Sequence, residues 1–457
     1  MLGLGFHWFD VNVDIIFSGS NAMITPSKNL KPGTLDPSFG TDGVLLVPIP
    51  EISANNVPAL CALPDNKLLA IMPLLGVRAP VVVVRLNEDG TLDTNFGDSG
   101  AGYTELPFMS GEALSGINAL ADGGALVRFR YPENGNVYSI IIKLRSDGTF
   151  NTTFGNNGVV RILGWNRSQQ SEGAGSLQVN DEPLGRAQGG RRYSALEDPV
   201  GNIVLIDEID FFGRARVVVN RLKSDGSFDE NFNGGRAIVE LPGVEYQWLL
   251  RGGFAVQSDG RVVATGVYGD DTYRGAFIVR FDNSGSPDAG FNNGAPVVIP
   301  TNADSRLGHV AVNMRQDGTE RIVLAGYVAS GGNYSGFMVV LDGDGYYDPL
   351  FNEGQPLYSK FSYGSFWWSN CNARNDGSII AVGFGSNELH DGGTLTACYR
   401  DDGTLDSEFN DGQGFVVYAG PDGSRPPSDM ADMDDRRIVI SGSGFDRNNN
   451  WVLRYLG

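Results

Sequence analysis

Four residues with charged or aromatic side chains occupy one recurring position in the sequence, nine residues before the glycine of a tight turn. They are Arg192, Arg251, His309 and Trp368. Guanidinium and imidazolium groups bind anions through charge-assisted hydrogen bonds, so this set could hold a carboxylate or an acidic sugar. In an enzyme, His309 would be the candidate acid or base, and Arg192 and Arg251 would orient an anionic substrate. The structural alternative is that these side chains point into the protein and pair with acidic neighbours.

A second set of candidate binding residues is aromatic and lies where the sequence stops repeating. Rings with a polar edge suit stacking on sugars or on the side chains of a partner protein. The structural alternative is that the rings only cover the ends of the core. Besides Trp368, the set contains Trp165, Tyr246, Trp248, Tyr363 and Trp367.

Motifs of known enzymes and metal sites are absent from the sequence. The three histidines show no His-Glu-x-x-His spacing, and there is neither a Gly-x-Ser-x-Gly elbow nor a phosphate loop. Residues 342–345 (Asp-Gly-Asp-Gly) lack the ligand spacing of a calcium loop. The three cysteines, Cys61, Cys371 and Cys398, form no disulfide framework and are expected to be small core residues. We therefore expect no metal and no cofactor.

The charge balance narrows the classes of partner. The chain has 54 acidic and 34 basic residues, a formal net charge of −20, which disfavours nucleic-acid binding. The sequence contains no run of 18 apolar residues, so we expect no transmembrane helix. The first basic residue is Lys28, so no secretory signal with a basic start is recognisable. Residues 1–22 are expected to be either a decorating strand or sequence ahead of a natural start at Met23.

One motif organises nearly the whole chain. The pattern Gly-x-x-Asp-x-x-Phe occurs seven times, with Asn in place of Asp once, in units of about 58 residues. One unit is longer by about 20 residues, which we assign to an inserted loop at about 164–191. The phenylalanines of the motif are Phe39, Phe96, Phe154, Phe232, Phe291, Phe351 and Phe409.

Each unit carries four short β-rich runs bounded by turn residues. In one unit these runs are residues 253–257, 262–264, 277–279 and 296–299. Four strands in each of seven units predict an all-β fold, a seven-bladed β-propeller. Residues 44–47 are expected to complete the last blade and close the ring, which removes open sheet edges. We predict one domain over residues 33–457, preceded by an extension over residues 1–32.

The motif residues themselves are expected to be structural. The Asp-Gly pair supplies a turn, the motif Asp caps the next turn by accepting backbone N–H groups, and the Phe fills the gap between blades. A cation recurs five residues before the leading glycine and should pair with the motif Asp. Val340 breaks this pattern in a unit that retains Asp348, so the Asp cannot exist only to neutralise that cation. The cations are Arg85, Lys143, Arg221, Arg280 and Arg454.

The repeat resembles that of a known family. The stretches RLNEDGTLDTNFG at residues 85–97 and RDDGTLDSEF at residues 400–409 are similar to the bacterial delta-sixty repeat, and the similarity covers nearly the whole chain past residue 33. The resemblance implies a propeller-type β fold in a bacterial protein that is secreted or located at the cell surface. It implies no single activity shared by the family. It assigns no catalytic residue to this chain.

Three functions follow as hypotheses from these observations. The main prediction is a non-enzymatic binding module, a monomeric ring that presents an aromatic loop face to a glycan or protein partner. The alternative is a hydrolase or lyase that acts on an anionic substrate at the mouth of the central channel. A further alternative is a structural component of a bacterial surface or delivery assembly.

Overall fold

A computed structural model describes most of the chain, with short gaps and two long ones. The described residues are 31–49, 51–54, 56–76, 79–97, 100–109, 113–134, 136–166, 195–211, 214–270, 274–299, 304–359, 361–387, 392–420, 423–444 and 449–457. Arg192 and most of the expected insertion at 164–191 therefore lie outside the described residues, as do residues 1–30.

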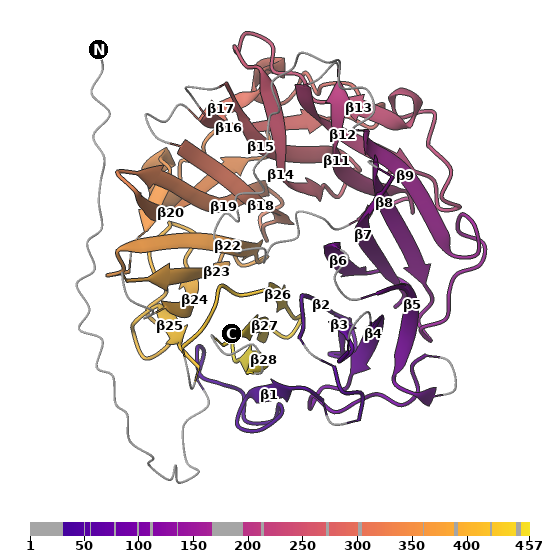
Figure 1. Ribbon diagram of the computed structural model, residues 1–457. Helices are drawn as coiled ribbons and strands as arrows, with labels where there is room; N and C mark the ends of the chain where they lie inside the picture. Colours follow the sequence, from indigo (N-terminus) through magenta and orange to yellow (C-terminus); the bar gives the residue numbers. More distant parts are fainter. Residues whose placement is uncertain are drawn as a thin grey trace.

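Seven four-stranded antiparallel sheets follow one another around a ring (Figure 1). Blade 1 comprises β2 (Ala59–Ala62), β3 (Leu68–Pro73), β4 (Pro80–Leu86) and β5 (Tyr103–Met109). Blade 2 comprises β6 (Ala113–Ala119), β7 (Ala125–Glu133), β8 (Asn136–Leu144) and β9 (Val159–Asn166). Blade 3 comprises β10 (Leu196–Glu197), β11 (Ile203–Phe211), β12 (Arg214–Leu222) and β13 (Arg236–Ile238).

The other four blades repeat this order. Blade 4 comprises β14 (Trp248–Val256), β15 (Val262–Gly269), β16 (Arg274–Phe281) and β17 (Val297–Ile299). Blade 5 comprises β18 (Asp304–Met314), β19 (Glu320–Ser330), β20 (Asn333–Asp342) and β21 (Leu357–Ser359). Blade 6 comprises β22 (Ser365–Ala373), β23 (Ile379–Ser386), β24 (Gly392–Tyr399) and β25 (Phe415–Tyr418). Blade 7 comprises β26 (Asp429–Asp432), β27 (Ile438–Ser443), β28 (Asn450–Tyr455) and, from the N-terminal part, β1 (Val44–Val47).

The sheets confirm the predicted all-β, seven-bladed propeller. β1 pairs with β28 in antiparallel register, with Val44 opposite Leu453, so strands from the two ends of the described chain share one sheet. The only described helices are three short 3₁₀ turns, η3 (Asn233–Gly235), η4 (Asn292–Gly294) and η5 (Phe351–Gly354). No helix among the described residues is long and apolar enough to cross a membrane.

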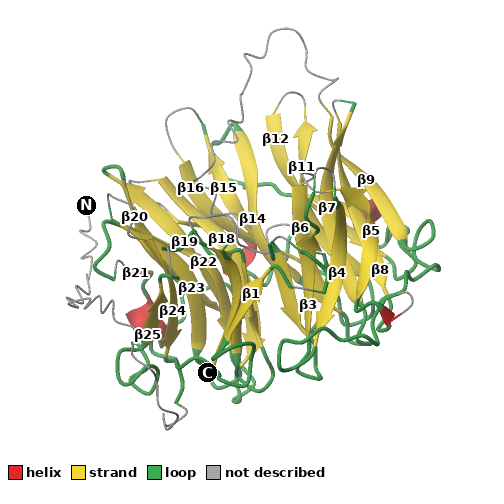
Figure 2. Cartoon of the chain, turned by 60° about the horizontal axis from the view of Figure 1, so that its bottom comes forward, coloured by secondary structure: helices red, strands yellow, loops and turns green. Residues whose placement is uncertain are grey.

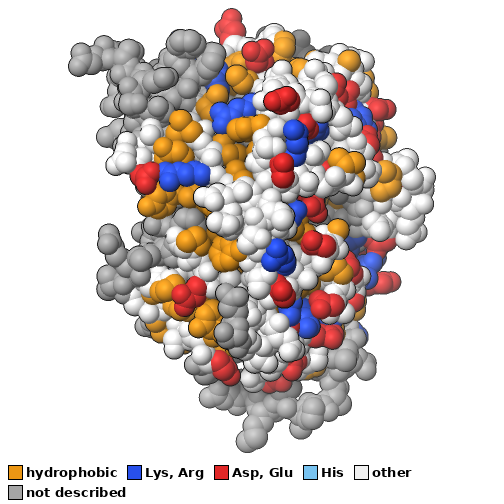
Figure 3. All heavy atoms as spheres, turned by 90° about the vertical axis from the view of Figure 1, so that its right-hand side faces the viewer, with side chains coloured by type: hydrophobic (Ala, Val, Ile, Leu, Met, Phe, Trp, Pro, Cys, Tyr) orange, Lys and Arg blue, Asp and Glu red, His pale blue; other side chains and the backbone are white. Residues whose placement is uncertain are grey.

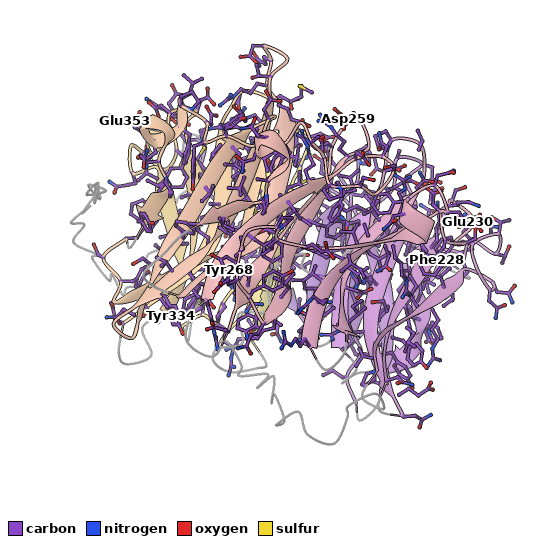
Figure 4. All side chains as sticks on the ribbon, turned by 90° about the horizontal axis from the view of Figure 1, so that it is seen from above. Phe228, Glu230, Asp259, Tyr268, Tyr334 and Glu353 are labelled. Carbon is purple, nitrogen blue, oxygen red and sulfur yellow. The ribbon has the colours of Figure 1, made fainter. Side chains whose placement is uncertain are left out.

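The ring has two different faces. The turns between the first and second strands and the Gly-x-x-Asp-x-x-Phe segments between the third and fourth strands gather on one face, which we call the motif face (Figure 2). The other connections lie on the opposite face, the crossing face. In Figure 4, Glu230, Asp259 and Glu353 mark the motif face, and Tyr268 and Tyr334 lie toward the crossing face. Acidic and basic side chains are interspersed on the side shown in Figure 3, despite the net charge of −20.

The motif joins each blade to the next one. The motif phenylalanines are at most 2% exposed, and six of them lie against the leading glycine of the following blade. At Gly345, for example, φ is +86° and an added Cβ would lie 2.6 Å from a ring carbon of Phe291, so only glycine fits. The motif Asp accepts a backbone N–H two residues later, as Asp36 does from Ser38 at 3.0 Å. The predicted turn-capping and gap-filling roles are therefore confirmed.

A guanidinium group completes this contact between blades. Arg221 donates to Asp229 at 2.8 Å and to the carbonyl of Asn283 in the next blade at 2.7 Å, and it lies over the ring of Phe232. The same set of contacts is made by Arg454 in blade 7. We call the phenylalanine, its Asp, the cation and the following glycine the inter-blade clasp.

Blade 5 builds its clasp from a different strand. Val340 occupies the cation position of β20, but Arg321 from the neighbouring strand β19 lies 3.4 Å from Asp348 and over the ring of Phe351. Arg321 also donates to the carbonyl of Asp401 in the next blade at 2.9 Å, and Arg315 makes a second pair with Asp348. The cation that the sequence lacks at position 340 is thus supplied from position 321, and Asp348 is not left without one.

Moving this cation back should restore the clasp. Arg321→Val leaves Asp348 buried with less compensation, and we expect it to lower the free energy of unfolding by about 3 kcal/mol, the low end for one partner of a buried ion pair. Adding Val340→Arg returns a guanidinium to the strand that carries it in other blades, and we expect at least half of the loss to be recovered. Denaturant unfolding measures both values.

The exposed variant Arg214→Val serves as the control and should change stability by less than about 0.5 kcal/mol. A double variant no more stable than Arg321→Val alone would show that the two positions are not interchangeable.

Candidate functional site

The repeat supplies a reference for finding unusual residues. In each blade, the turn between the first two strands ends at a residue whose carbonyl accepts a backbone hydrogen bond, such as Asn202 in blade 3. The residue five positions later lies in the second strand. Six blades place an apolar residue or glycine there, and blade 3 places Asp207. One position earlier in the second strand, six blades carry either an apolar residue or a Ser or Thr. Blade 2 carries Arg128 there. The six residues equivalent to Asp207 are Met72, Phe129, Gly266, Leu324, Gly383 and Gly442.

These two exceptions meet in the core between blades 2 and 3. An Arg128 Nη2–H donates to Asp207 Oδ1 at 2.5 Å, and the Ser139 hydroxyl donates to the same oxygen at 2.7 Å. Asn220, also at a position that is apolar in the other blades, donates to Asp207 Oδ2 at 3.2 Å. Arg128 and Asn220 have no exposed surface, and Asp207 is 4% exposed. Burying charges is costly unless they are paired, so this group replaces hydrophobic packing at a loss of stability.

Blade 4 contributes a second guanidinium group. Arg251 in β14 is 2% exposed, and its Nη1 lies 3.6 Å from Asp207 Oδ1. Its backbone N–H donates to Oε1 of the half-buried Glu208 at 3.1 Å. We call Arg128, Ser139, Asp207, Asn220 and Arg251 the Asp207 cluster.

The cluster is locally rich in positive charge. Arg236 in β13 also interacts electrostatically with Asp207. Burial lowers the pKa of Arg236, and the charge of Asp207 opposes that shift. The guanidinium groups of Arg128, Arg251 and Arg236 thus all interact with the one carboxylate of Asp207. No group of three or more metal-ligating side chains occurs among the described residues.

His309 lies between blades 5 and 6, away from the Asp207 cluster. It is 6% exposed, and its Nδ1 accepts the backbone N–H of Cys371 at 3.4 Å. The Sγ of Cys371 lies 3.4 Å from the same nitrogen. A β-bulge in β18, between Leu307 and His309, sets this orientation. A catalytic role for His309 stays a prediction, and the geometry gives it a structural contact.

Trp368 packs in the same gap as His309. It is 2% exposed and lies edge-on to Phe361, Phe366 and Tyr399. Arg251, His309 and Trp368 therefore keep equivalent places in three innermost strands, but Arg251 reaches Asp207 of blade 3, whereas His309 and Trp368 share the gap between blades 5 and 6. Binding of a common ligand by these residues stays a prediction, and Arg192 lies outside the described residues.

The aromatic residues predicted for the loop face are mostly covered. Trp248 is 9% and Tyr363 is 8% exposed. Tyr246 and Trp367 are half-buried, the first under Arg216 and the second against Phe384 and Tyr334. Trp165 is part of β9 instead of opening a loop. Little ring surface among these described side chains is presented to a partner.

Glu320 is a further exception to the repeat. It begins β19 at a position that is apolar in the other blades, among them Leu68, Val262 and Ile379. Its Oε2 accepts from Nε2 of Gln257 in blade 4 at 2.5 Å. Burial raises the pKa of Glu320, and the negative charge of Asp259 adds to the shift.

Sequence reasoning missed Arg128, Asp207, Glu208 and Glu320. Charged residues in a strand ordinarily face solvent, so their types alone gave no signal. An alignment of the second strands of all blades would have shown that charged residues occupy positions that are buried and apolar in other blades.

Comparisons with known proteins agree on the fold. A family model described as "Domain of unknown function (DUF5122) beta-propeller" matches residues 81–96 and 257–291. No curated protein matches the sequence. The narrower resemblance to the delta-sixty repeat stays a prediction.

Solved structures match over most of the chain at low identity. The polysaccharide lyase Uly1 is 11% identical, with 96% of this chain and 94% of that chain covered and a TM-score of 0.47. The alpha-L-arabinanase of Penicillium chrysogenum is 11% identical, with 94% and 98% covered and a TM-score of 0.39. The GH74 xyloglucanase of Xanthomonas campestris is 13% identical, with 89% and 55% covered and a TM-score of 0.42. At these values the similarity is one of fold.

The main functional prediction, a non-enzymatic binding module, is wrong on these findings. The matched propellers carry the names of glycan-active enzymes, the class named in the alternative prediction. The physical reason lies in the aromatic loop face that the prediction required, since Trp248, Tyr363 and Trp368 are buried. The sequence pattern correctly located aromatic residues at the ends of the blades. Their rings pack against other side chains of the protein.

Replacing Glu320 should stabilise the protein in a pH-dependent way. A carboxyl group whose pKa is raised on folding stabilises the folded state at low pH and loses that contribution as pH rises through its folded pKa. Glu320→Leu, the residue type of blade 1, removes the penalty on the charged form. We expect a higher unfolding temperature at pH 7 and a gain that shrinks as pH falls from the raised folded pKa toward the unfolded pKa of about 4. A gain that is equal at both pH values would contradict the burial of a charged Glu320.

Proposed function

We propose that the chain is a hydrolase or lyase that acts on an anionic glycan, with the Asp207 cluster and Glu208 forming the substrate site. The observation that carries the proposal is the excess of guanidinium groups at one junction of a protein whose net charge is −20. In the other six blades the position of Asp207 holds an apolar side chain or glycine, and that of Arg128 an uncharged residue. Retaining charge in a core is costly, which is typical of a site kept for function.

The residue types suit a sugar that carries a carboxylate. A guanidinium group binds a carboxylate through charge-assisted hydrogen bonds, and Arg251 would hold the acidic group of the substrate. In a lyase, neutralising that carboxylate makes the neighbouring C–H more acidic, and the protein stabilises the negative charge that develops when the proton leaves.

Glu208 would be the proton acceptor at this site. It is half-buried, in contrast to Asp207, and the backbone N–H of Arg251 holds its Oε1 at 3.1 Å. In a lyase it would take the proton from carbon while the bond to the leaving sugar oxygen breaks, which leaves a C=C bond in the product. In a hydrolase the same carboxylate would take a proton from the attacking water. The two reactions are distinguished by the product.

Polyuronates test this proposal. We expect the purified chain to cleave an acidic polysaccharide such as polygalacturonate or alginate, and not a neutral arabinan. New reducing ends report cleavage, and ultraviolet absorbance reports an unsaturated product. Glu208→Gln should lower kcat at least about 100-fold, the usual size of general acid–base catalysis. Arg251→Lys should mainly raise KM, because it keeps the charge but loses the forked geometry.

Glu230→Gln is the matched control, because Glu230 is exposed on the motif face (Figure 4) and should retain full activity. Circular dichroism and the unfolding temperature would show that each variant is folded. Undiminished cleavage by a folded Glu208→Gln, or no cleavage of any acidic glycan by the wild-type chain, contradicts the proposal.

A further inference from the structure

A second unusual place lies between blades 3 and 4, at the motif of blade 4. A cavity of about 60 Å³ opens there between the apolar side chains of Pro242, Phe281 and Pro287. Its polar lining includes Arg280, Asp288 and Glu240. We call it the Pro287 cavity. It is formed by outer strands and motif residues, apart from the residues of the Asp207 cluster.

The cavity exists because Pro287 is smaller than its counterparts. The residue before the motif Asp or Asn is Leu, Phe or Tyr in the other six blades. In five of these blades it covers the glycine that follows the motif, whereas Gly354 of blade 5 has no such contact with Tyr347. A Cβ added to Gly235 would lie 2.6 Å from Phe228, and one added to Gly102 would lie 2.4 Å from Leu92. At Gly294 of blade 4 the nearest atom belongs to Ala289, 3.5 Å away. Phe228, the counterpart of Pro287 in blade 3, is labelled in Figure 4.

The same motif contains a buried hydrogen-bond donor that lacks an acceptor. Arg280 is 2% exposed; its Nε donates to Asp288 at 2.6 Å and its Nη1 to the carbonyl of Gly343. Its Nη2 is buried and has no hydrogen-bond partner.

The equivalent atom in blade 7 has a partner. Nη2 of Arg454 donates to Oγ of Ser38 at 2.9 Å, and Gly290 stands in the place of Ser38 in blade 4. A Cβ at Gly290 would lie 3.8 Å from Nη2 of Arg280. Pro287 thus stands beside a small cavity, and Gly290 lacks the acceptor that serves the equivalent guanidinium in blade 7.

We propose that the Pro287 cavity binds an acetamide group, whose carbonyl oxygen accepts from Nη2 of Arg280 and whose methyl group packs on the prolines. A neutral acceptor fits better than an anion, because Asp288 already balances Arg280 and Glu240 lines the wall. The size agrees, since one water needs roughly 10–15 Å³ and an acetamide has about four heavy atoms. An N-acetylated sugar and an N-acetylated peptide both carry this group.

Ligand-observed NMR titrations with two probes and one negative probe test the proposal. N-acetylglucosamine and N-acetylglycine amide carry the group, and glucosamine lacks it. We expect saturable binding of at least one of the first two and none of glucosamine. Binding of the sugar alone assigns a glycan as the source, and binding of the amide alone assigns a peptide. Binding of both supports recognition of the acetamide itself.

Two variants that restore the repeat should close the site. Gly290→Ser supplies the missing acceptor for Arg280, and Pro287→Leu fills the space. Gly290 does not have the positive φ that would exclude a side chain. We expect each variant to weaken binding at least about tenfold, which corresponds to one hydrogen bond to a charged group. Both add contacts, so their unfolding temperatures should not fall.

The neighbouring change Ala289→Ser is the control, because Ala289 is exposed and does not line the cavity. It should leave the dissociation constant unchanged. Equal binding of glucosamine, no binding of any probe, or unchanged binding by both closing variants overturns the proposal. The test is separate from the proposed cleavage of glycans, because it measures binding at residues that the reaction does not use.

Discussion

The contact of the motif phenylalanine with the glycine of the next blade, made by six of the seven, is the constraint on which the ring depends. Phe291 lies so close to Gly345 that any Cβ would overlap it, and the same arrangement recurs around the ring. Each sheet buries one face against the blade before it and the other against the blade after it. The motif fixes how far apart two blades stand, and it explains why blade 5 retains a cation at Asp348 although the residue moved to another strand.

A repeat this regular makes its exceptions informative. Arg128, Asp207 and Asn220 stand at positions that are not charged in any other blade, and they contact one another instead of lying scattered. Pro287 and Gly290 are likewise exceptions within a single motif, and together they create a space and an uncovered donor. In both places the packing common to all blades has been given up locally. Because such a loss destabilises the fold, binding or catalysis is the natural reason for it.

The number of blades and the place of the strands could be predicted from the sequence, because the spacing of Phe39 to Phe409 counts the units directly. The role of the motif Asp could also be predicted from its position in a turn. The direction of individual side chains could not. The strand register is irregular after Arg251 in β14, before His309 in β18 and after Trp368 in β22. An irregularity of one residue changes which gap a side chain enters, and no residue type marks it. Finding the charged residues at core positions requires knowing the register of the second strands. That register becomes visible only when the repeats are aligned on their turns.

The proposed reaction requires the Asp207 cluster and Glu208 to receive the acidic group of a glycan. A crystal structure of the Glu208→Gln variant with an acidic oligosaccharide would reveal this contact, since slowed turnover would leave the substrate intact. We expect a sugar carboxylate within hydrogen-bond distance of Arg251, with the scissile linkage beside residue 208. An oligosaccharide bound elsewhere on the ring, with Arg251 contacting only Asp207, would contradict it.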